Sequence, residues 1–430
     1  MKRGVTLVGV PSGESFRAPK GTQDVFGPEA ARWERLLVAF ADRVASAGYG
    51  LIQSPMFEDL GVFRRLGEET DVVTKEMYDF VDKGDRHIAL RPEGTASVVR
   101  AFVQHHPVTP WKTWYATPAF RYESPQSGRL RQHHQVGIEA IGSADPDLDV
   151  EIVALGHDHL RGLGLRRLVL LVNSMGTRED RERYVTRLRG WLTERAGDLA
   201  AEDRPKLDTN PMRVLDSKRA ATQAVVRDAP KITEDLSDEA AARFERVTGG
   251  LGALGIDFQL EPRLVRGLDY YRHTTFEFQS EAIDAAQSTV LAGGRYDGLV
   301  EDMGGPPTPG MGFGSGIERT LLACDAEGVF PAPASTLDVF VVDVTGGDIA
   351  RDLTSDLRRA GFRADRAFDA RSMRAQMKAA DRSGARFALI VGDQEKEDGT
   401  VAVRSLLDEE RPPGVVPAET VADPLRAALR

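Results

Sequence analysis

Apolar residues recur at helical spacing in the first well-patterned segment of the chain. Proline suits the first turn of a helix, where its missing N–H would have no partner, so Pro28 is a natural beginning. Gly48 and Gly50 provide the end. The apolar side chains between them, at intervals of three and four, are Trp33, Leu36, Leu37, Phe40 and Val44. This pattern predicts an amphipathic helix with one face turned to a core.

The next segment, YGLIQSPMFE at residues 49–58, has the composition of a strand that Pro55 interrupts. Because proline cannot donate a ladder hydrogen bond, we expect this strand at a sheet edge or a subunit boundary. A helix is predicted to follow RPEGT at residues 91–95. Its buried side chains would be Val98, Val99, Phe102 and Val103.

An alternating pattern predicts a long antiparallel hairpin over residues 113–141. In its first arm Phe120 and Tyr122 alternate with Arg121 and Glu123. In its second arm the apolar positions are Val136, Ile138 and Ala140, and the positions that alternate with them are Gln135, Gly137 and Glu139. Since the period is two, Gln135 and Glu139 share a face. The connecting loop is polar and basic, and we expect His133 and His134 to be solvated loop residues.

The rest of the chain divides into three parts. Residues from about 175 to 260 are charged and helical in pattern, which indicates a helical insertion. Strands are then predicted over RLVRGLDYY, TTFEFQS and MGFGSG, and the last of these continues into the helix IERTLLAC. The Pro-rich segment VFPAPAST predicts a domain boundary near residue 330. Beyond it, strands at DVFVVDV and ARFALIVG alternate with helices over 348–360 and 371–383, which is typical of a small α/β domain.

Composition places the chain among globular proteins of two or three domains. It has 430 residues, of which 41% are hydrophobic and 28% charged. The apolar run near the N-terminus is too short for a signal peptide, and no later stretch approaches the roughly 18 uninterrupted apolar residues of a membrane span. The single cysteine, Cys324, excludes an internal disulfide framework and a thiolate-rich metal site. A reducing cytoplasm fits these features best.

Charge is distributed unevenly along the chain. The formal net charge is −10, which argues mildly against a nucleic-acid partner. Residues 351–386, however, contain ten Lys and Arg against five Asp and Glu. Four of these cations would form one stripe on a helix, namely Arg371, Arg374, Lys378 and Arg382. Taken alone, this stripe is better explained as a solvated helix face.

Several familiar phosphate-binding and catalytic motifs are absent from the sequence. It contains no G-x-x-x-x-G-K-[ST] loop, no dinucleotide-binding fingerprint, no H-E-x-x-H and no G-x-S-x-G elbow. Phosphate chemistry would therefore require arginines held on a scaffold.

Four segments together resemble the histidyl-tRNA synthetases. They are RPEGT at 91–95, FRYESPQSGRLRQHHQVGIEAIG at 120–142, LVRGLDYY at 264–271 and GFGSGIER at 312–319. FRYE with its basic loop resembles motif 2 of class II synthetases, GFGSGIER resembles motif 3, and Pro55 resembles the motif 1 proline of the dimer interface. LVRGLDYY and AGGRYDG are similar to the histidine-specific elements. The resemblance extends from KGTQDVFG at 20–27 to the C-terminal domain.

The resemblance implies a fold and a reaction. Residues 1–330 would form an α+β catalytic domain with a central antiparallel sheet and the helical insertion, and residues 331–430 a small α/β anticodon-binding domain. The protein would be a homodimer that activates L-histidine with ATP, accompanied by Mg²⁺, and transfers it to tRNA. The resemblance implies neither zinc nor an organic cofactor.

The resemblance also assigns ATP to specific residues. Arg121 would bind the α-phosphate, Glu123 would lie near adenine and Arg319 would hold the γ-phosphate. The backbone would approach adenine at Gly312, Gly314 and Gly316. The alternatives are a surface salt bridge between Arg121 and Glu123, a solvated Arg319 and glycines that serve only strand–helix packing.

For histidine, the resemblance implies that Arg266 is a catalytic arginine that contacts the histidine carboxylate and the α-phosphate of ATP. A guanidinium fork can bond two such oxygens at once. The α-amino group would be held by Glu93, Thr95 and Gln135, and the imidazole by Glu139 and Tyr271. A site built for both imidazole nitrogens can reject analogues that lack them by about 10⁴-fold. The alternatives are an ion pair of Arg266 with Asp269 and a core role for Tyr271.

The basic stripe gains a further interpretation from the resemblance. In this family the C-terminal domain binds the tRNA anticodon, so Arg371, Arg374, Lys378 and Arg382 become candidate RNA contacts. Gln126 and Arg129 match positions that approach the acceptor end of the tRNA. Ser127 and Leu130 depart from the lysine and tyrosine of many bacterial members.

Two rival functions remain open. One is the regulatory subunit of ATP phosphoribosyltransferase in histidine biosynthesis, a non-catalytic relative that normally lacks the anticodon domain and departs from RPEGT. The other is a class II synthetase for threonine or proline, against which LVRGLDYY and AGGRYDG argue.

Overall fold

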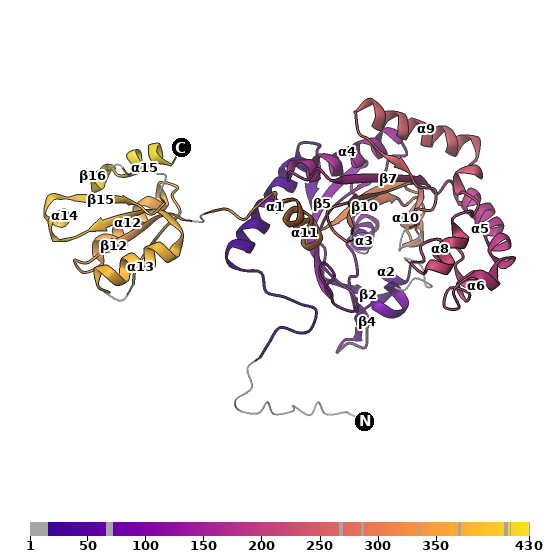
Figure 1. Cartoon of the computed structure of the whole chain (residues 1–430), viewed down its shortest axis with the longest axis horizontal. Helices are drawn as coiled ribbons and strands as arrows, with labels where there is room; N and C mark the ends of the chain where they lie inside the picture. The colour runs from indigo at the N-terminus through magenta and orange to yellow at the C-terminus, as the bar shows by residue number, and fades with distance from the viewer. Residues whose placement is uncertain are drawn as a thin grey trace, which may run out of the picture. The chain divides into compact units, whose positions relative to one another are not determined.

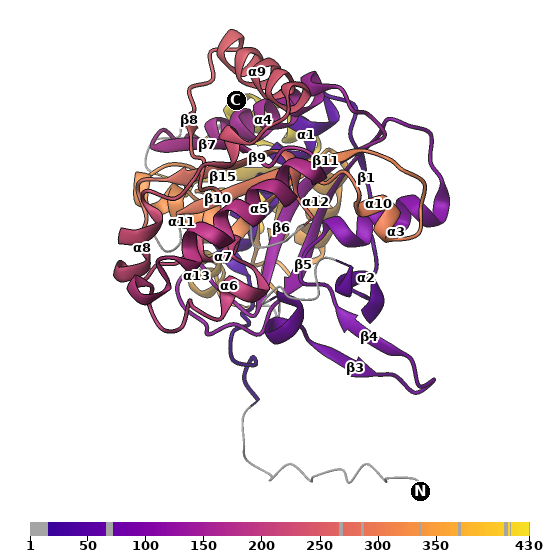
Figure 2. The ribbon, with the colours of Figure 1, turned by 90° about the vertical axis from the view of Figure 1, so that its right-hand side faces the viewer.

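The computed structural model describes residues 16–65, 72–265, 270–284, 288–334, 337–368, 371–407, 412 and 414–429. One compact unit extends from Trp33 to Pro331, and a second begins at Ala332. Figures 1 and 2 show the larger unit as a broad sheet with helices on both sides. Within the described residues, no helix has the length and apolar character needed to cross a membrane.

The larger unit is built on an eight-stranded sheet in the order β1-β5-β6-β11-β10-β9-β7-β8. Its outer pairs, β1 with β5 and β7 with β8, are parallel, and the inner pairs are antiparallel. The strands are β1 Gly50–Leu51, β5 Trp111–Phe120, β6 Gln132–Ile141, β7 Leu168–Ser174, β8 Gln259–Leu260, β9 Arg272–Ser280, β10 Thr289–Arg295 and β11 Gly310–Gly316.

The predicted hairpin is confirmed as β5 and β6, which pair from Trp111 opposite Ile141 to Phe120 opposite Gln132. Two details of the prediction are wrong. The first arm ends at Phe120, so Arg121 and Glu123 follow the strand and do not alternate along it. His133 and His134 belong to β6 and are partly buried, because the second arm begins earlier than its apolar pattern suggests.

One face of the sheet carries the main core. The helices α1 Gly27–Ala45, α4 Pro146–Gly162 and α11 Ile317–Glu327 supply side chains to it. Leu36 and Phe40 of α1 pack with Val136 and Ile138 of β6, as the two periodicities predict. Cys324 of α11 is buried in the same core. The opposite face of the sheet packs against α3 Thr95–His105, the helix predicted to follow RPEGT.

The segment predicted as a strand interrupted by Pro55 forms two short strands on either side of the proline, and both lie at sheet edges as expected. β1 ends at Leu51, and β2, Phe57–Asp59, belongs to a separate three-stranded sheet with β4 His87–Leu90 and β3 Asp79–Val81. Pro55 lies between the two strands, where no ladder donor is needed. The buried Arg91 fixes this segment, since its guanidinium donates to the Ser54 hydroxyl at 3.0 Å and to the Pro55 carbonyl at 3.3 Å.

The region predicted as a helical insertion is helical in the structure. Its helices are α5 Arg178–Thr193, α6 Lys206–Thr209, α7 Met212–Leu215, α8 Ala220–Val226 and α9 Asp238–Ala253. Thr177 and Asp180 form a capping box at the start of α5. The strand predicted over RLVRGLDYY is wrong for its described residues, because β9 begins only at Arg272; residues 266–269 lie outside the described part.

The second unit is a small α/β domain with a five-stranded sheet in the order β13-β12-β14-β15-β16. The predicted elements are confirmed as β12 Leu337–Asp343, α12 Asp348–Arg359, α13 Met373–Ser383 and β14 Ala385–Val391. Sequence patterns did not predict β13 Ala364–Arg366, α14 Asp393–Asp398, β15 Thr400–Ser405, β16 Gly414–Pro417 and α15 Ala422–Ala428. Most of these are short, and a few residues hold too little of a period to be recognised.

Candidate active site

Glu139, in the middle of β6, is a fully buried carboxylate surrounded by hydroxyl groups. It accepts hydrogen bonds from the Thr95 hydroxyl at 2.7 Å, from the Tyr296 hydroxyl at 2.8 Å and from the Tyr115 hydroxyl at 3.4 Å. Three parts of the fold therefore meet at one side chain. Thr95 comes from α3, Tyr115 from β5, and Tyr296 directly follows β10. Sequence analysis selected Glu139 and Thr95 but not the two tyrosines.

Burial raises the pKa of Glu139 from 4.5 to about 8, although the hydrogen bonds from Thr95 and Tyr296 lower it in part. The same desolvation raises the pKa of Tyr115 and Tyr296 above their usual range. Near neutral pH the Glu139 carboxyl group is therefore mostly protonated. A carboxyl group in this state can either donate to or accept from a ring nitrogen.

Glycines make room for this cluster. Gly312 of β11 lies opposite Glu139, and a Cβ there would stand 1.9 Å from Oε2 of Glu139. A Cβ on Gly137 would stand 2.4 Å from the Tyr115 ring. A Cβ on Gly314 would be 3.6 Å from the Gln135 amide nitrogen, and one on Gly316 would be 3.8 Å from Cβ of Arg319. Of the three glycines expected against adenine, only Gly312 is therefore required by a close approach; Gly310, the fourth glycine of β11, is required as well, because a Cβ there would stand 2.1 Å from the Tyr296 ring.

Glu93 and Tyr271 border the same buried region. Both carboxylate oxygens of Glu93 accept backbone N–H groups at the start of α3, from Thr95 and Ala96 at 2.7 Å each. Burial raises the pKa of Glu93, and these bonds oppose the rise. The Tyr271 ring packs against that of Tyr270, with centroids 4.6 Å apart and a tilt of 46° between the rings, and it lies over Gly294. Glu93 thus has a helix-capping role in addition to any contact with a ligand.

A polar cavity of about 200 Å³ lies toward the other end of β6. Among the described residues, three arginines line it: Arg121, Arg129 and Arg319. Its other lining residues are Glu123, Gly128, Leu130, His133, Gln135, Thr289, Val290, Leu291, Ala292, Gly314, Gly316 and Glu318. The cavity therefore brings together five of the candidate ATP residues, namely Arg121, Glu123, Gly314, Gly316 and Arg319. The sixth, Gly312, is not among its lining residues and lies against Glu139 instead.

The cations in this cavity are held by protein groups. Arg121 donates to the Pro92 carbonyl at 3.0 Å, and Arg319 donates to the Thr289 carbonyl at 3.1 Å. Burial and the neighbouring Arg129 lower the pKa of Arg319. Glu123 pairs with Arg129 at 2.6 Å, which differs from the Arg121–Glu123 pair considered from the sequence. An anion entering here meets more positive than negative charge.

The two adjacent histidines have different surroundings. Burial and the cations Arg121 and Arg319 lower the pKa of His133 to about 3, so its imidazole is neutral. Nδ1 of His134 lies 2.8 Å from Glu318, and its backbone N–H also bonds that carboxylate. Glu318 occupies the first turn of α11 and so ties β6 to the helix that carries Arg319. Neither set of partners was predicted from the sequence, where both histidines were expected to be solvated.

The candidate RNA contacts come from two segments of the chain, and one of them, Arg129, also lines the cavity. Gln126 and Arg129 bond each other through their backbones in the loop between β5 and β6, at 2.9 and 3.0 Å. Arg374, Lys378 and Arg382 are exposed on α13, and the exposed Arg371 precedes the cap of that helix. Arg266 lies outside the described residues. No cluster of three or more potential metal ligands occurs among the residues that the structure describes.

Two family models match this chain. One, described as histidyl-tRNA synthetase, matches residues 21–320, and another, described as anticodon binding domain, matches residues 338–427. Histidine–tRNA ligases of Levilactobacillus brevis and Nocardia farcinica are 45% and 46% identical to it, each over 91% of this chain and over 93% and 94% of their own lengths. The apo crystal structure of S. aureus histidyl-tRNA synthetase is similar to it with a TM-score of 0.78 and 34% identity, over 95% of this chain and 99% of that one.

Proposed function

The chain belongs to the histidyl-tRNA synthetase family, and from this premise we propose how its residues divide the work of histidine–tRNA ligation. The expected fold class is confirmed, with a large mixed sheet in the first unit and a small α/β anticodon-binding domain after it. The family joins histidine to tRNA at the expense of ATP. In the first step a carboxylate oxygen of histidine bonds the α-phosphorus and pyrophosphate leaves. In the second step a tRNA hydroxyl takes the histidyl group and AMP leaves.

The buried Glu139 is the single observation that carries the assignment of the amino-acid site. A carboxyl group held by three hydroxyls at fixed distances can bond one imidazole nitrogen, and Tyr271 can bond the other. An apolar side chain in this place would leave these groups unpaired, which is the physical basis of strong discrimination. Thr95, Gln135 and Glu93 border the same region and would receive the α-amino group.

The arginine-lined cavity is assigned to ATP. Arg121 would bind the α-phosphate and Arg319 the γ-phosphate, since charge-assisted bonds to phosphate are the strong ones. Glu123 and the backbone of Gly314 and Gly316 would lie against adenine. Arg266 would face the reacting carboxylate and the α-phosphate, where its charge would stabilise the transition state.

Mg²⁺ is proposed to enter the cavity with ATP. Of the described lining residues, the carboxylates are Glu123 and Glu318; Glu123 is ion-paired with Arg129, and Glu318 is bonded to His134. The residues present therefore fit an ion that arrives on the phosphates better than a resident ion. Bound there, Mg²⁺ would neutralise charge on the pyrophosphate.

Exchange of labelled pyrophosphate into ATP tests the adenylation assignment. We expect exchange with histidine and none above background with the other amino acids at equal concentration. Threonine and proline are the informative controls, because they represent the other synthetases considered. Exchange that depends on either of them would overturn the assignment of the pocket.

Residues 331–430 are proposed as the anticodon-binding domain, with residues 1–330 as the catalytic domain. The exposed stripe of α13 supports this division, because exposed cations suit phosphate contacts. A chain that ends near residue 328 should keep pyrophosphate exchange and charge tRNA with a strongly raised KM. Arg374→Gln with Lys378→Gln should mimic the defect and reduce the salt slope of tRNA binding by roughly one unit per lost phosphate contact. Wild-type charging by the truncated chain would contradict the proposal.

A homodimer is proposed, with the segment around Pro55 in the interface. Apolar side chains are exposed along this part of the molecule, on β1 and on the three-stranded sheet: Leu51, Met56, Phe57, Phe80 and Val81. A second copy that covered them would remove this apolar surface from water. Sedimentation at micromolar concentration should give twice the chain mass. A fully active monomer would exclude the proposal.

The regulatory-subunit alternative is less supported. The family model for an anticodon-binding domain matches residues 338–427, a part that such subunits normally lack, and the relatives are ligases. Because the proposed reaction consumes tRNA and ATP, we assign the protein to the cytoplasm.

A further inference from the structure

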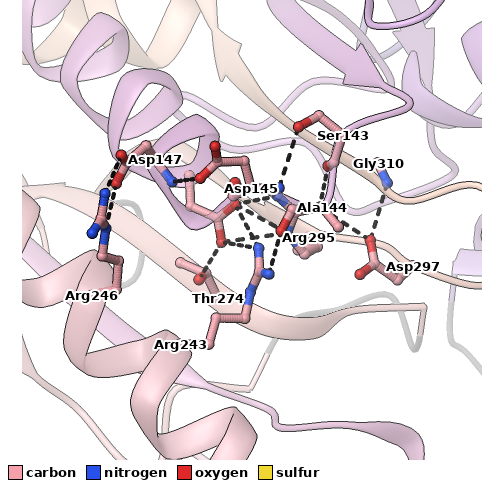
Figure 3. Close-up of polar contacts among 11 residues, drawn as sticks. Ser143, Ala144, Asp145, Asp147, Arg243, Arg246, Thr274, Arg295, Asp297 and Gly310 are labelled. Atoms are coloured by element: carbon pink, nitrogen blue, oxygen red, sulfur yellow. Dashed lines mark hydrogen bonds and ion pairs between the residues drawn. The ribbon is translucent and has the colours of Figure 1, made fainter.

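A second buried charge cluster lies beside the imidazole pocket, and the proposed function leaves it without a role. Its centre is Arg295, the last residue of β10, which is fully buried. Nε of Arg295 donates to the equally buried Asp149 at 3.0 Å. Nη1 donates to the Ser143 carbonyl at 2.9 Å and to Asp297 at 3.4 Å (Figure 3). Five N–H donors in a rigid fork can serve all these acceptors, which an ammonium group could not.

Asp149, on α4, also accepts hydrogen bonds from two other elements. The Thr274 hydroxyl of β9 donates to it at 2.6 Å, and Nη2 of Arg243 donates to it at 3.3 Å. Arg243 belongs to α9, the last helix of the helical insertion. One turn along the same helix, Arg246 pairs with Asp147 at 2.6 Å, but that pair is exposed and has no bond to Arg295 (Figure 3).

Arg243 and Arg295 also hold the turn that follows β6. Arg243 donates to the Ala144 carbonyl, and Arg295 donates to the carbonyls of Ser143 and Asp145. This turn comes directly after the strand that carries Glu139. The cluster therefore fixes the end of β6 from two sides.

The cluster also reaches Glu139 through Tyr296, the residue after Arg295. The Tyr296 hydroxyl donates to Glu139 at 2.8 Å, and its backbone N–H donates to the Gly310 carbonyl at 2.8 Å. Asp297, which accepts from Arg295, also accepts the Gly310 N–H at 3.0 Å. Displacement of the Arg295 guanidinium would therefore move the Tyr296 hydroxyl and the carboxyl group of Glu139.

We propose that the Arg295–Asp149 ion pair is a positioning device for recognition of the imidazole, and that Arg243 couples the helical insertion to it. This inference rests on the proposed assignment of Glu139. Arg295, Asp149 and Arg243 touch no substrate; they act on the geometry of Tyr296 and Glu139. A ligand group bound by two nitrogens at fixed spacing is sensitive to such geometry, because small misplacement lengthens both hydrogen bonds at once.

The test compares Arg243→Ala with Arg246→Ala in the full-length protein. Both changes remove one arginine from the same face of α9 and one ion pair with α4, but only the first touches Asp149. We expect Arg243→Ala to raise the histidine KM in pyrophosphate exchange by about five- to ten-fold, within the coupling found inside one hydrogen-bond network. The ATP KM should be unchanged in both variants, and Arg246→Ala should keep the wild-type histidine KM.

Equal histidine KM values for the two variants would overturn the coupling, and so would a parallel rise in the histidine and ATP KM of Arg243→Ala. Arg295→Lys, which keeps the charge and loses the fork, should raise the histidine KM more than Arg243→Ala does. Glu139→Gln separates this inference from the proposed function. If Glu139→Gln leaves the histidine KM unchanged, the pocket assignment fails; if it raises that KM while Arg243→Ala and Arg295→Lys do not, only the positioning role fails.

Discussion

The two ends of β6 present different groups to a ligand: a buried hydrogen-bonded carboxyl group at one end and an arginine-lined cavity at the other. At Glu139 the strand is enclosed, and a carboxyl group is bonded by three hydroxyls with no exposed surface. At His133 and Gln135 the strand borders a cavity of about 200 Å³ lined by three arginines among its described residues. The enclosed end offers hydroxyl and carboxyl groups, whereas the open end offers an excess of positive charge.

This difference indicates where selectivity and where reaction rate arise. A closed set of neutral hydrogen-bonding groups rejects a wrong side chain by leaving partners unpaired. Cations arranged in advance around phosphates act on charge that develops during the reaction. Variants at the enclosed end should therefore change the histidine KM. Variants at the open end should change kcat and the ATP KM.

The largest effect is expected from Arg266→Ala. Loss of a guanidinium that stabilises transition-state charge should lower kcat for pyrophosphate exchange by roughly 10²–10³-fold, with little change in the histidine KM. Steady-state exchange at saturating ATP measures both constants, and circular dichroism checks the fold. Near wild-type exchange by this variant would remove Arg266 from the mechanism.

Gly312→Ala should be the next most damaging change. The new Cβ would stand 1.9 Å from Oε2 of Glu139 and 2.3 Å from the Ile138 carbonyl. Overpacking of this kind costs about 1–3 kcal/mol and should appear as a lower Tm together with a raised histidine KM. Gly316→Ala is the matched control, because its Cβ would come no nearer than 3.8 Å to the Arg319 side chain. Equal behaviour of the two variants would contradict the close approach.

Glu139→Gln and Tyr271→Phe sharpen the comparison at the enclosed end. Each removes one partner of a buried hydrogen bond, so histidine binding should weaken by about 1–3 kcal/mol. The ATP KM should stay near the wild-type value, since the cavity is unchanged. If neither variant changes the histidine KM, the imidazole binds elsewhere.

The smallest effect is on the pH dependence of the free energy of unfolding, to which Glu139 and His133, at the two ends of β6, should contribute in opposite directions. Glu139 has a pKa of about 8 in the folded chain against 4.5 ordinarily, so the folded state alone keeps its proton between these values. Stability therefore falls as pH rises from 4.5 to 8. His133 has a pKa of about 3 against 6.5, so stability falls as pH drops below 6.5. Urea unfolding of Glu139→Gln should remove the fall in stability between pH 4.5 and 8, and that of His133→Asn should remove the fall below pH 6.5.

The elements around the site were largely predictable, but the contacts inside it were not. Alternation of apolar side chains was sufficient to predict β6 and to place Gln135 and Glu139 on one face. It could not show that Tyr296 donates to Glu139, because the two are 157 residues apart and no local period connects them. The interruption at Pro55 was predicted, but the buried Arg91 that holds this segment was not. The pairing of Glu318 with His134 is missed for the same reason of sequence distance.

The buried position of Cys324 has a practical consequence for labelling experiments. It is the only cysteine of the 430-residue chain, and it is enclosed in the main core. A buried thiol reacts slowly with aqueous reagents. A cysteine introduced at exposed Asp381, on α13 but outside the basic stripe, should therefore take one fluorophore with the native thiol left in place. Emission from that single dye would report directly on RNA arriving at α13, without any measurement of turnover.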